Sequence, residues 1–259
     1  MKLSGNTILI TGGTSGIGLE LAAQLLKLDN TVIVTGRNVS KLEQTQRSLP
    51  GIHTFQSDLT NTTSIRSLFD TAIEKFPALN VLINNAGIMR RINLLDQRNS
   101  LEDISREIET NLTGTVRMVK QFLPHLNSQD FAAIVNISSG LAFVPLPIAP
   151  IYCATKAAVH SFTQSLRVQL HETRIKVFEL APPMTRTPLF AGEIHADDVK
   201  GIRMMDVSKM VGQAIRALEK DRLEIRPGLS NILNLMSRIA PQFILKRLSE
   251  SASTAAGMP

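Results

Sequence analysis

The sequence predicts a single α/β domain with a parallel sheet and helices on both of its faces. Short apolar runs rich in β-branched residues alternate along the chain with longer segments of helical periodicity. Because each expected strand is followed by a helix, the strands should run parallel and the crossovers should cover both faces. At 259 residues and 43% hydrophobic composition, the chain has enough apolar material for a core without disulfides or metals.

The individual elements follow from this alternation. The expected strands cover residues 7–11, 31–35, 53–56, 81–84, 132–138, 175–180 and 223–226. The expected helices cover residues 19–28, 40–49, 64–75, 103–123, 152–172 and 206–220. The helix at 103–123 is expected to carry one apolar stripe, formed by Ile104, Ile108, Leu112, Val116, Val119 and Leu123.

No repeat or linker divides the chain, so residues 1–250 are expected to form one domain. An irregular stretch at 184–205 is expected to be a lid over the substrate. Residues 230–249 form an apolar and basic helical tail, and residues 251–259 are expected to be disordered. The tail is expected to lie on a membrane surface, to pack in the core, or to form a contact between subunits. We favour the contact between subunits.

Composition excludes several classes of function. The net charge of +6 and pI of about 9.7 suit a nucleic-acid binder, but the basic residues are dispersed, with one Tyr and no Trp for base stacking. The five histidines do not cluster with acids or cysteine, so no metal is expected. The single cysteine, Cys153, fits a reducing cytoplasm, where we expect the protein. No apolar run is long enough for an integral membrane segment.

A glycine-rich turn after the first expected strand indicates a dinucleotide site. Residues 11–18 read TGGTSGIG and lead directly into a helix. Gly12 permits the tight turn, Gly16 lets the backbone approach a pyrophosphate, and Gly18 lets the helix pack closely on the strand. The pyrophosphate would lie at the positive N-terminus of that helix.

The end of the second expected strand predicts which dinucleotide binds. An acidic residue there would bind the adenosine ribose, whereas an arginine suits a 2′-phosphate. The sequence has Arg37 and no acid, so we expect NADP(H) in preference to NAD(H); a solvated surface arginine is the alternative. Asp58, after the third strand, is expected either to accept a hydrogen bond from the adenine or to cap the next helix.

Tyr152 and Lys156 form a candidate catalytic pair. They are four residues apart in a helical segment, which places them on one face. A free tyrosine has a pKa near ~10, and a neighbouring cation favours the phenolate and lowers that pKa. Ser139, at the end of a buried strand, is expected to share an oxyanion with the tyrosine, whereas strand alternation points Ser138 to the other face. Cys153 is expected to be a packing residue.

These motifs, in this order, resemble the short-chain dehydrogenase/reductase family over residues 3–230. The matching positions are residues 11–18, Asp58, residues 84–87, Asn111, Ser139, Tyr152, Lys156 and residues 182–187. The resemblance implies a Rossmann-like, doubly wound sheet of about seven strands. It also implies a homodimer or homotetramer, paired through the helices at 103–123 and 152–172.

The resemblance also implies roles for individual residues. Tyr152 would be the acid/base and Ser139 would hold the substrate oxygen. Lys156 would lower the tyrosine pKa and bind the nicotinamide ribose, and Asn111 would hold a proton-relaying water. The implied cofactor contacts are Gly12, Thr14, Ser15, Gly16, Ile17, Gly18, Arg37, Asp58, Leu59, Asn85, Ala86, Gly87, Tyr152, Lys156, Pro182 and Thr187.

One departure from the family pattern lies after the sixth strand. The family has Pro-Gly where this chain has Pro182-Pro183, and the second proline removes an amide donor and fixes φ. This feature, together with the segments SSGLAFVPL, EIRPG and LMSRIAP, resembles a bacterial branch of the family, the DltE-like oxidoreductases.

The expected activity is hydride transfer between NADP(H) and a carbonyl or secondary alcohol. The alternative is a sensor that binds the dinucleotide with little turnover, although such a protein need not keep all four catalytic side chains. The substrate is expected to be a medium-sized, mostly apolar carbonyl compound. Arg90 and Arg91 are expected either to be solvated, which is the default, or to hold a carboxylate or phosphate of the substrate. The expected substrate contacts are Arg90, Leu141, Phe143, Ile148 and Met184.

Overall fold

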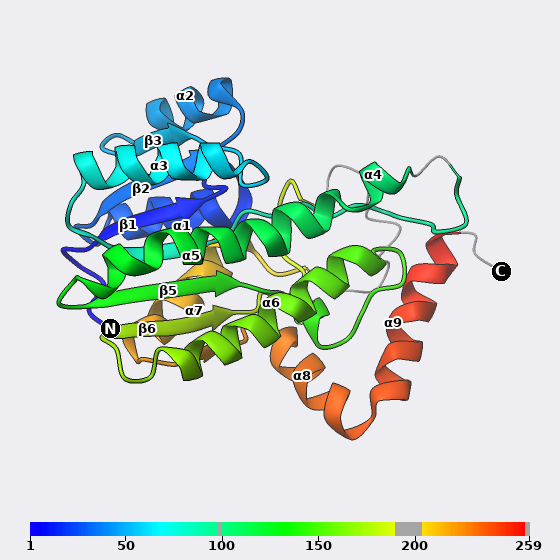
Figure 1. Cartoon of the computed structure of the whole chain (residues 1–259). Helices are drawn as coiled ribbons and strands as arrows, with labels where there is room; N and C mark the ends of the chain where they lie inside the picture. Colours follow the sequence, from blue (N-terminus) through cyan, green and yellow to red (C-terminus); the bar gives the residue numbers. More distant parts are fainter. Residues whose placement is uncertain (98–99, 190–203, 257–259) are drawn as a thin grey trace.

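The computed structural model describes residues 1–97, 100–189 and 204–256. These residues contain one seven-stranded sheet in the order β3-β2-β1-β4-β5-β6-β7 (Figure 1). Every neighbouring pair of strands is parallel. The expected α/β fold with a parallel, doubly wound sheet is therefore confirmed.

The strands and helices alternate as the sequence predicts. The strands are β1 (Thr7–Thr11), β2 (Thr31–Gly36), β3 (His53–Gln56), β4 (Leu79–Asn84), β5 (Ala132–Ile137), β6 (Ile175–Leu180) and β7 (Glu224–Ile225). The helices are α1 (Gly16–Leu26), α2 (Val39–Ser48), α3 (Thr62–Lys75), α4 (Leu101–Ile104), α5 (Gly114–Asn127), α6 (Pro150–Gln169), α7 (Val207–Glu219), α8 (Leu229–Ile239) and α9 (Pro241–Ala256). Two further turns are the π-helical η1 (Ile108–Thr113) and the 3₁₀-helical η2 (Gly140–Ala142).

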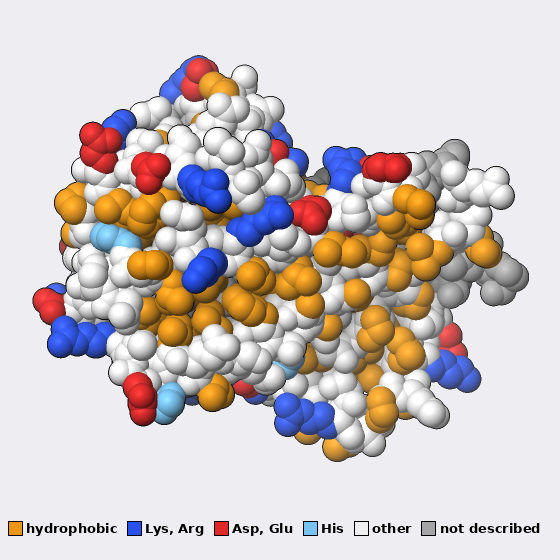
Figure 2. All heavy atoms as spheres, in the orientation of Figure 1, with side chains coloured by type: hydrophobic (Ala, Val, Ile, Leu, Met, Phe, Trp, Pro, Cys, Tyr) orange, Lys and Arg blue, Asp and Glu red, His pale blue; other side chains and the backbone are white. Residues whose placement is uncertain are grey.

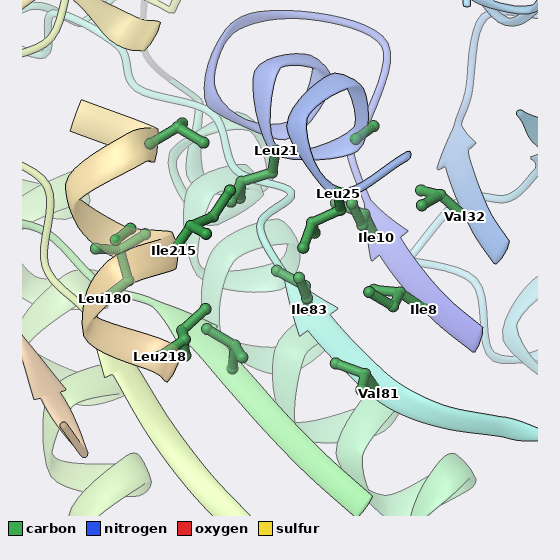
Figure 3. Close-up of a cluster of buried hydrophobic side chains, with 14 of the residues drawn as sticks. Ile8, Ile10, Leu21, Leu25, Val32, Val81, Ile83, Leu180, Ile215 and Leu218 are labelled. Carbon is green, nitrogen blue, oxygen red and sulfur yellow. The ribbon is translucent and has the colours of Figure 1, made fainter. Parts of the chain in front are cut away.

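Alternate residues of each strand build two hydrophobic layers, one on each face of the sheet. In β1, Ile8 and Ile10 point towards α1 and α7, where they join Leu21, Leu25 and other apolar side chains (Figure 3). Leu9, between them, belongs to the opposite layer, which α3, α5 and α6 cover. This period of two is what a strand buried on both faces requires.

The order of the strands determines where loops converge. The chain builds outward from β1 through β2 to β3, then returns to place β4 on the other side of β1. The loops after β1 and β4 therefore diverge, which leaves a crevice beyond the carboxyl ends of these two strands. Ligands of open parallel sheets bind in such a crevice.

The helix expected at 103–123 is interrupted, and its predicted apolar stripe is wrong. The segment contains α4, the π turn η1 and then α5. A π turn holds one more residue than an α turn, so it rotates the following side chains. The buried face of α5 is made by Thr115, Met118, Val119, Phe122 and Leu126, so of the expected stripe only Val119 belongs to it, while Leu123 packs at its edge.

Two residues of the predicted stripe are instead exposed on the molecular surface. Ile108 is 42% exposed and Val116 is 36% exposed. Figure 2 shows apolar side chains gathered over the face that α5 and α6 form. The expected pairing of subunits through these helices stays a prediction.

Buried amides connect the sheet to α6. The Asn84 side-chain amide donates to Asn136 Oδ1 across β4 and β5 at 2.8 Å. Asn136 in turn donates to Thr163 Oγ1 of α6 at 3.0 Å. All three side chains are buried, so each bond replaces hydration that the chain loses on folding.

The tail expected at 230–249 is a pair of helices, α8 and α9, beside the start of α6 (Figure 1). α9 ends at Ala256, and the disorder expected for residues 251–259 stays a prediction. Residues 257–259 and most of the expected lid, 190–203, lie outside the described residues. No helix of the described ranges is long and apolar enough to cross a membrane.

Phe122 should be a principal contributor to stability. It is fully buried, and its ring packs edge-on against Phe69 at 5.1 Å. We expect Phe122→Ala to lower the free energy of unfolding by about 3–5 kcal/mol, because it leaves a cavity. Phe243→Ala is the matched control, since this ring is 58% exposed, and should cost about 0.5 kcal/mol or less. Equal losses in urea unfolding would contradict the packing described.

Candidate active site

A cavity of about 440 Å³ lies at the carboxyl edge of the sheet. Its walls come from the loops after the first six strands, β1 to β6, and from α6. The predicted cofactor residues that line it are Gly12, Thr14, Ser15, Gly16, Ile17, Arg37, Asp58, Leu59, Asn85, Ala86, Gly87, Tyr152, Lys156, Pro182 and Thr187. Gly18 does not line the cavity: a Cβ there would lie 2.5 Å from the Gly12 carbonyl oxygen, so its role is the close packing of α1 on β1.

The glycine-rich turn forms a cradle that only glycine can form. Gly12 has a φ of +65°, and a Cβ on it would lie 2.8 Å from Ala86 Cα. Gly16 has a φ of +54° at the start of α1 and faces Thr187. Backbone N–H groups at a helix N-terminus suit phosphate oxygens, so these residues fit the pyrophosphate of a dinucleotide.

A hydrogen-bonded joint holds the turn after β1 against the loop after β4. Thr11 Oγ1 accepts from the backbone N–H groups of Asn85 at 3.0 Å and Ala86 at 3.1 Å. The Asn85 amide donates back to the carbonyl oxygens of Thr11 and Gly12, each at 3.0 Å. The two sides of the cavity are thereby fixed relative to each other.

Two cationic side chains line the part of the cavity beside β2. Arg37 follows the strand directly, and Lys41 lies in the first turn of α2. Sequence analysis missed Lys41, although its place four residues after Arg37 was a usable signal. Asp58 is turned to its own loop, where its Oδ1 accepts from the N–H and the hydroxyl of Thr60 at 2.9 and 2.8 Å.

Ser139, Tyr152 and Lys156 converge at the middle of the cavity. Tyr152 is 6% exposed and makes a side-chain hydrogen bond with Ser139. Lys156 Nζ lies 5.7 Å from the centre of the Tyr152 ring and donates to the Ile137 carbonyl oxygen at 2.8 Å. Ser138 instead turns away and donates to Glu179, so the choice of Ser139 from strand alternation agrees with this geometry.

Burial, and not the lysine, dominates the tyrosine pKa. It raises the pKa of Tyr152 well above 10; the Ser139 hydrogen bond lowers that pKa, whereas Cys153 and Glu107 raise it further. Burial also lowers the pKa of Lys156 to about 8, which weakens its cationic character. Desolvation of the phenolate therefore sets the net direction of the shift, and the expectation that Lys156 lowers the tyrosine pKa stays a prediction.

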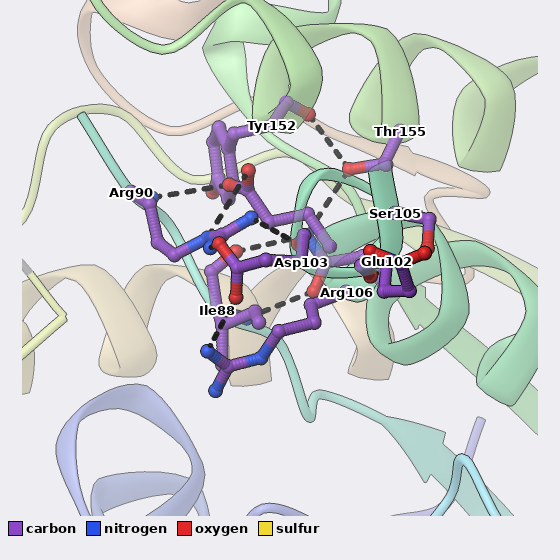
Figure 4. Close-up of polar contacts among 10 residues, drawn as sticks. Ile88, Arg90, Glu102, Asp103, Ser105, Arg106, Tyr152 and Thr155 are labelled. Carbon is purple, nitrogen blue, oxygen red and sulfur yellow. Dashed lines mark hydrogen bonds and ion pairs between the residues drawn. The ribbon is translucent and has the colours of Figure 1, made fainter. Parts of the chain in front are cut away.

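Asn111 is fully buried within the π turn and joins three segments. Its amide donates to the Ile88 carbonyl oxygen at 2.9 Å and to Thr155 Oγ1 at 3.1 Å, and its Oδ1 accepts from the Ile88 N–H at 2.8 Å (Figure 4). Both amide donors are thus used to hold the loop after β4 against α6. The π turn accommodates a residue that is unfavourable in an α-helix interior.

Arg90 does not face the cavity. It pairs with Asp103 and Glu107, and its Nη2 donates to the Asp103 carbonyl oxygen at 2.8 Å (Figure 4). Its side chain is only 12% exposed. The expectation that Arg90 holds a substrate anion is not supported, because these acidic partners already occupy the guanidinium.

The remaining predicted substrate residues divide into two groups. Leu141 and Met184 line the cavity. Phe143 and Ile148 do not: Phe143 packs edge-on against the His160 ring at 5.1 Å, and Ile148 is buried in a small core under the loop. Their apolar character thus stabilises the loop that follows Ser139.

The tail supplies walls that sequence analysis did not assign. Leu229 and Leu233 of α8 and Leu248 of α9 line the cavity beside Leu141 and Met184. This end of the cavity is apolar. The apolar periodicity of the tail predicted that one face of these helices is buried. It did not indicate that this face lines the cavity.

Cys153 is a packing residue in this arrangement. It is buried, and its sulfur accepts from the Leu146 N–H at 3.2 Å. Burial raises the pKa of its thiol to about 11. Within the described ranges, no three His, Cys, Asp or Glu side chains gather as metal ligands would.

Comparison with known proteins is consistent with this geometry. The family model described as short chain dehydrogenase matches residues 6–198. An uncharacterised oxidoreductase, DltE of Bacillus subtilis (strain 168), is 48% identical over 189 residues, which cover 73% of this chain and 75% of that protein.

Two solved structures have the same fold. A short chain dehydrogenase from Burkholderia cenocepacia J2315 in complex with NADP is 26% identical with a TM-score of 0.81, covering 96% of this chain and 99% of that one. A short chain dehydrogenase/reductase from Burkholderia phymatum in complex with NAD is 22% identical, also with a TM-score of 0.81, covering 92% of this chain and 95% of that one.

The Cys153 thiol should be unreactive in the folded protein. With its pKa raised to about 11, roughly one thiol in a thousand is ionised at pH 8. We therefore expect no labelling by iodoacetamide at pH 8 until guanidinium unfolds the chain, followed by modification at one site. Rapid labelling of the folded protein, measured by mass spectrometry, would contradict the described burial.

Proposed function

The chain belongs to the short-chain dehydrogenase family, and from this premise we propose that it is an NADP(H)-dependent oxidoreductase acting on a carbonyl or a secondary alcohol. The observation that carries the proposal is the convergence of Ser139, Tyr152 and Lys156 in a cavity whose other half is the glycine cradle. Hydride transfer needs a proton donor or acceptor at the substrate oxygen, and these side chains supply it.

Proton transfer is assigned to Tyr152. When bound, the nicotinamide supplies or accepts the hydride at the substrate carbon. Ser139 and Tyr152 hold the carbonyl oxygen through their hydroxyl groups, and Tyr152 donates its proton as negative charge develops there. Lys156 stabilises the resulting phenolate, and Asn111 keeps the neighbouring loop in place.

The raised tyrosine pKa favours the reductive direction. Because burial raises the pKa of Tyr152, the phenol is protonated at neutral pH and ready to act as an acid. Oxidation of an alcohol requires the phenolate, which becomes available only at higher pH. At neutral pH, Tyr152 is therefore in the protonation state that carbonyl reduction requires.

Arg37 and Lys41 support the preference for NADP(H). Both line the cavity beside β2, where a 2′-phosphate would attach to the adenosine ribose. No acidic residue occupies positions 36–38 to repel that phosphate. Similar folds have been solved with NADP and with NAD, so the preference is carried by these two cations.

The substrate is proposed to be a neutral, largely apolar carbonyl compound. Leu141, Met184, Leu229, Leu233 and Leu248 line that end of the cavity. Among the described residues, no cationic side chain lines this end of the cavity, and Arg90 is engaged by Asp103 and Glu107. Burying an unpaired charge among these leucines would be costly.

Tyr152→Phe tests the proposed acid directly. Loss of the hydroxyl should lower kcat for NADPH-dependent reduction by about 10²- to 10⁴-fold, since it removes general acid catalysis. The binding of NADPH, measured by fluorescence titration, should be unchanged. Turnover at 340 nm across a panel of neutral ketones and aldehydes gives the measurement; an equally active variant would remove Tyr152 from the mechanism. Tight NADPH binding with no turnover of any compound by the parent would favour the sensor alternative.

Arg37→Ala tests the cofactor preference. We expect the KM for NADPH to rise by about tenfold, the value of a charge-assisted hydrogen bond, whereas the KM for NADH stays the same. Arg47→Ala is the control, because Arg47 is an exposed arginine of α2 whose guanidinium pairs with Glu43 of the same helix. If the parent prefers NADH, or if Arg37→Ala and Arg47→Ala change the KM for NADPH equally, Arg37 is a solvated surface residue.

A further inference from the structure

A buried carboxylate behind the active site has no part in the mechanism above. Glu179 lies in β6, and its side chain is 2% exposed. Its two oxygens have different partners: Ser138 Oγ donates to Oε1, and His160 Nδ1 lies 2.7 Å from Oε2. A buried carboxylate is tolerated when both oxygens are satisfied in this way, and removal of one partner is costly.

The two hydrogen-bond partners of Glu179 lie on the two segments that carry the catalytic hydroxyl groups. Ser138 immediately precedes Ser139 at the end of β5, and its N–H donates to the Leu180 carbonyl oxygen at 2.8 Å. His160 lies one helical turn after Lys156 and two turns after Tyr152, on the same face of α6. Glu179 therefore joins the strand end that carries Ser139 to the helix that carries Tyr152.

The other side of His160 contacts the loop that follows Ser139. The Phe143 ring lies edge-on to the imidazole at 5.1 Å. His160 is thus held between Glu179 and Phe143, and any movement of the imidazole would be transmitted to both. Its side chain is 19% exposed, so it can exchange protons with solvent.

These three polar side chains are not arranged as a hydrolase triad. In such a triad the histidine lies between the nucleophile and the acid. Here the carboxylate lies between the serine and the histidine, so no histidine base contacts Ser138. The arrangement therefore suits a structural link and not a nucleophile. We call this link, formed by Ser138, Glu179 and His160, the brace.

We propose that Glu179 is a positioning residue that, through Ser138 and His160, fixes the separation between Ser139 and Tyr152. This proposal rests on the proposed function, because it requires that both hydroxyl groups hold one carbonyl oxygen. Glu179 touches neither the substrate nor the cofactor in this role. Since oxyanion donors act through preorganised geometry, a small displacement of Ser139 lowers turnover more than it lowers binding.

The charges around His160 make the brace dependent on pH. Glu179 of β6 raises the pKa of His160, as does Glu224 of β7, whereas burial and Arg226 lower it; the net direction is upward. Glu224 is itself paired with Arg167 of α6 and with Arg226. The ionic part of the brace is therefore complete below the ordinary imidazole pKa of about 6.5 and is lost as the pH rises through the raised value.

Glu179→Gln is the first test, because the amide has the same shape but cannot accept at both ends. We expect kcat to fall by roughly tenfold or more with the affinity for NADPH unchanged. Thr163→Val is the matched control: it removes the buried hydrogen bond from Asn136 between the same strand β5 and helix α6, and it leaves both hydrogen bonds of Glu179 in place. It should lower the melting temperature similarly but leave kcat unchanged.

His160→Asn is the second test and applies even if Glu179→Gln does not fold. Asparagine keeps a donor near the position of Nδ1 but does not titrate. We expect the parent to show an ionisation of kcat above pH 6.5 that is absent from His160→Asn. In the parent, NMR should place the His160 pKa above 6.5.

The outcomes separate this proposal from the proposed function. Loss of kcat in Glu179→Gln but not in Thr163→Val supports positioning. Full kcat in Glu179→Gln, loss of kcat in both variants in proportion to their melting temperatures, or identical pH profiles of the parent and His160→Asn would each overturn it while the enzyme itself stands. A parent without turnover would remove both proposals.

Discussion

The close approach of two backbone turns, one after β1 and one after β4, is the constraint on which the site depends. These turns meet where the strand order reverses, and the Cβ of any residue at Gly12 would collide with Ala86. The hydroxyl of Thr11 and the amide of Asn85 then lock the turns together. Both the opening of the cavity and the exposure of the N-terminus of α1 follow from this contact.

Desolvation sets the protonation states at the centre of the cavity. Tyr152 and Lys156 are both almost fully buried, and burial moves each pKa towards the neutral form of the group. The pair is therefore less charged than two neighbouring groups on an exposed helix would be. A neutral phenol beside a partly neutral amine costs less to bury than a phenolate and an ammonium that are not in contact.

Much of the site was predictable from the sequence, because it is encoded by local patterns. The glycine turn, the order of strands and helices, and the choice of Ser139 over Ser138 depend on spacing and alternation alone. They agree with the structure for that reason.

What could not be predicted depends on contacts between distant segments. The π turn at Asn111 exists because its amide bonds to Ile88 and Thr155, neither of which is near it in the sequence. Arg90 was assigned to the substrate because nothing local indicates that Asp103 and Glu107 would pair with it. Burial reversed the expected direction of the tyrosine pKa, and burial is a property of the assembled fold.

The leucines contributed by α8 and α9 have a consequence for how this family diversifies. The region matched by the family model ends at residue 198, whereas Leu229, Leu233 and Leu248 lie beyond it. The glycine cradle thus lies wholly within the matched region, whereas the apolar half combines Leu141 and Met184 of that region with leucines of the tail. Two related chains can keep every residue of the cradle and still admit different molecules, because a few substitutions in a short helical hairpin reshape the opposite wall.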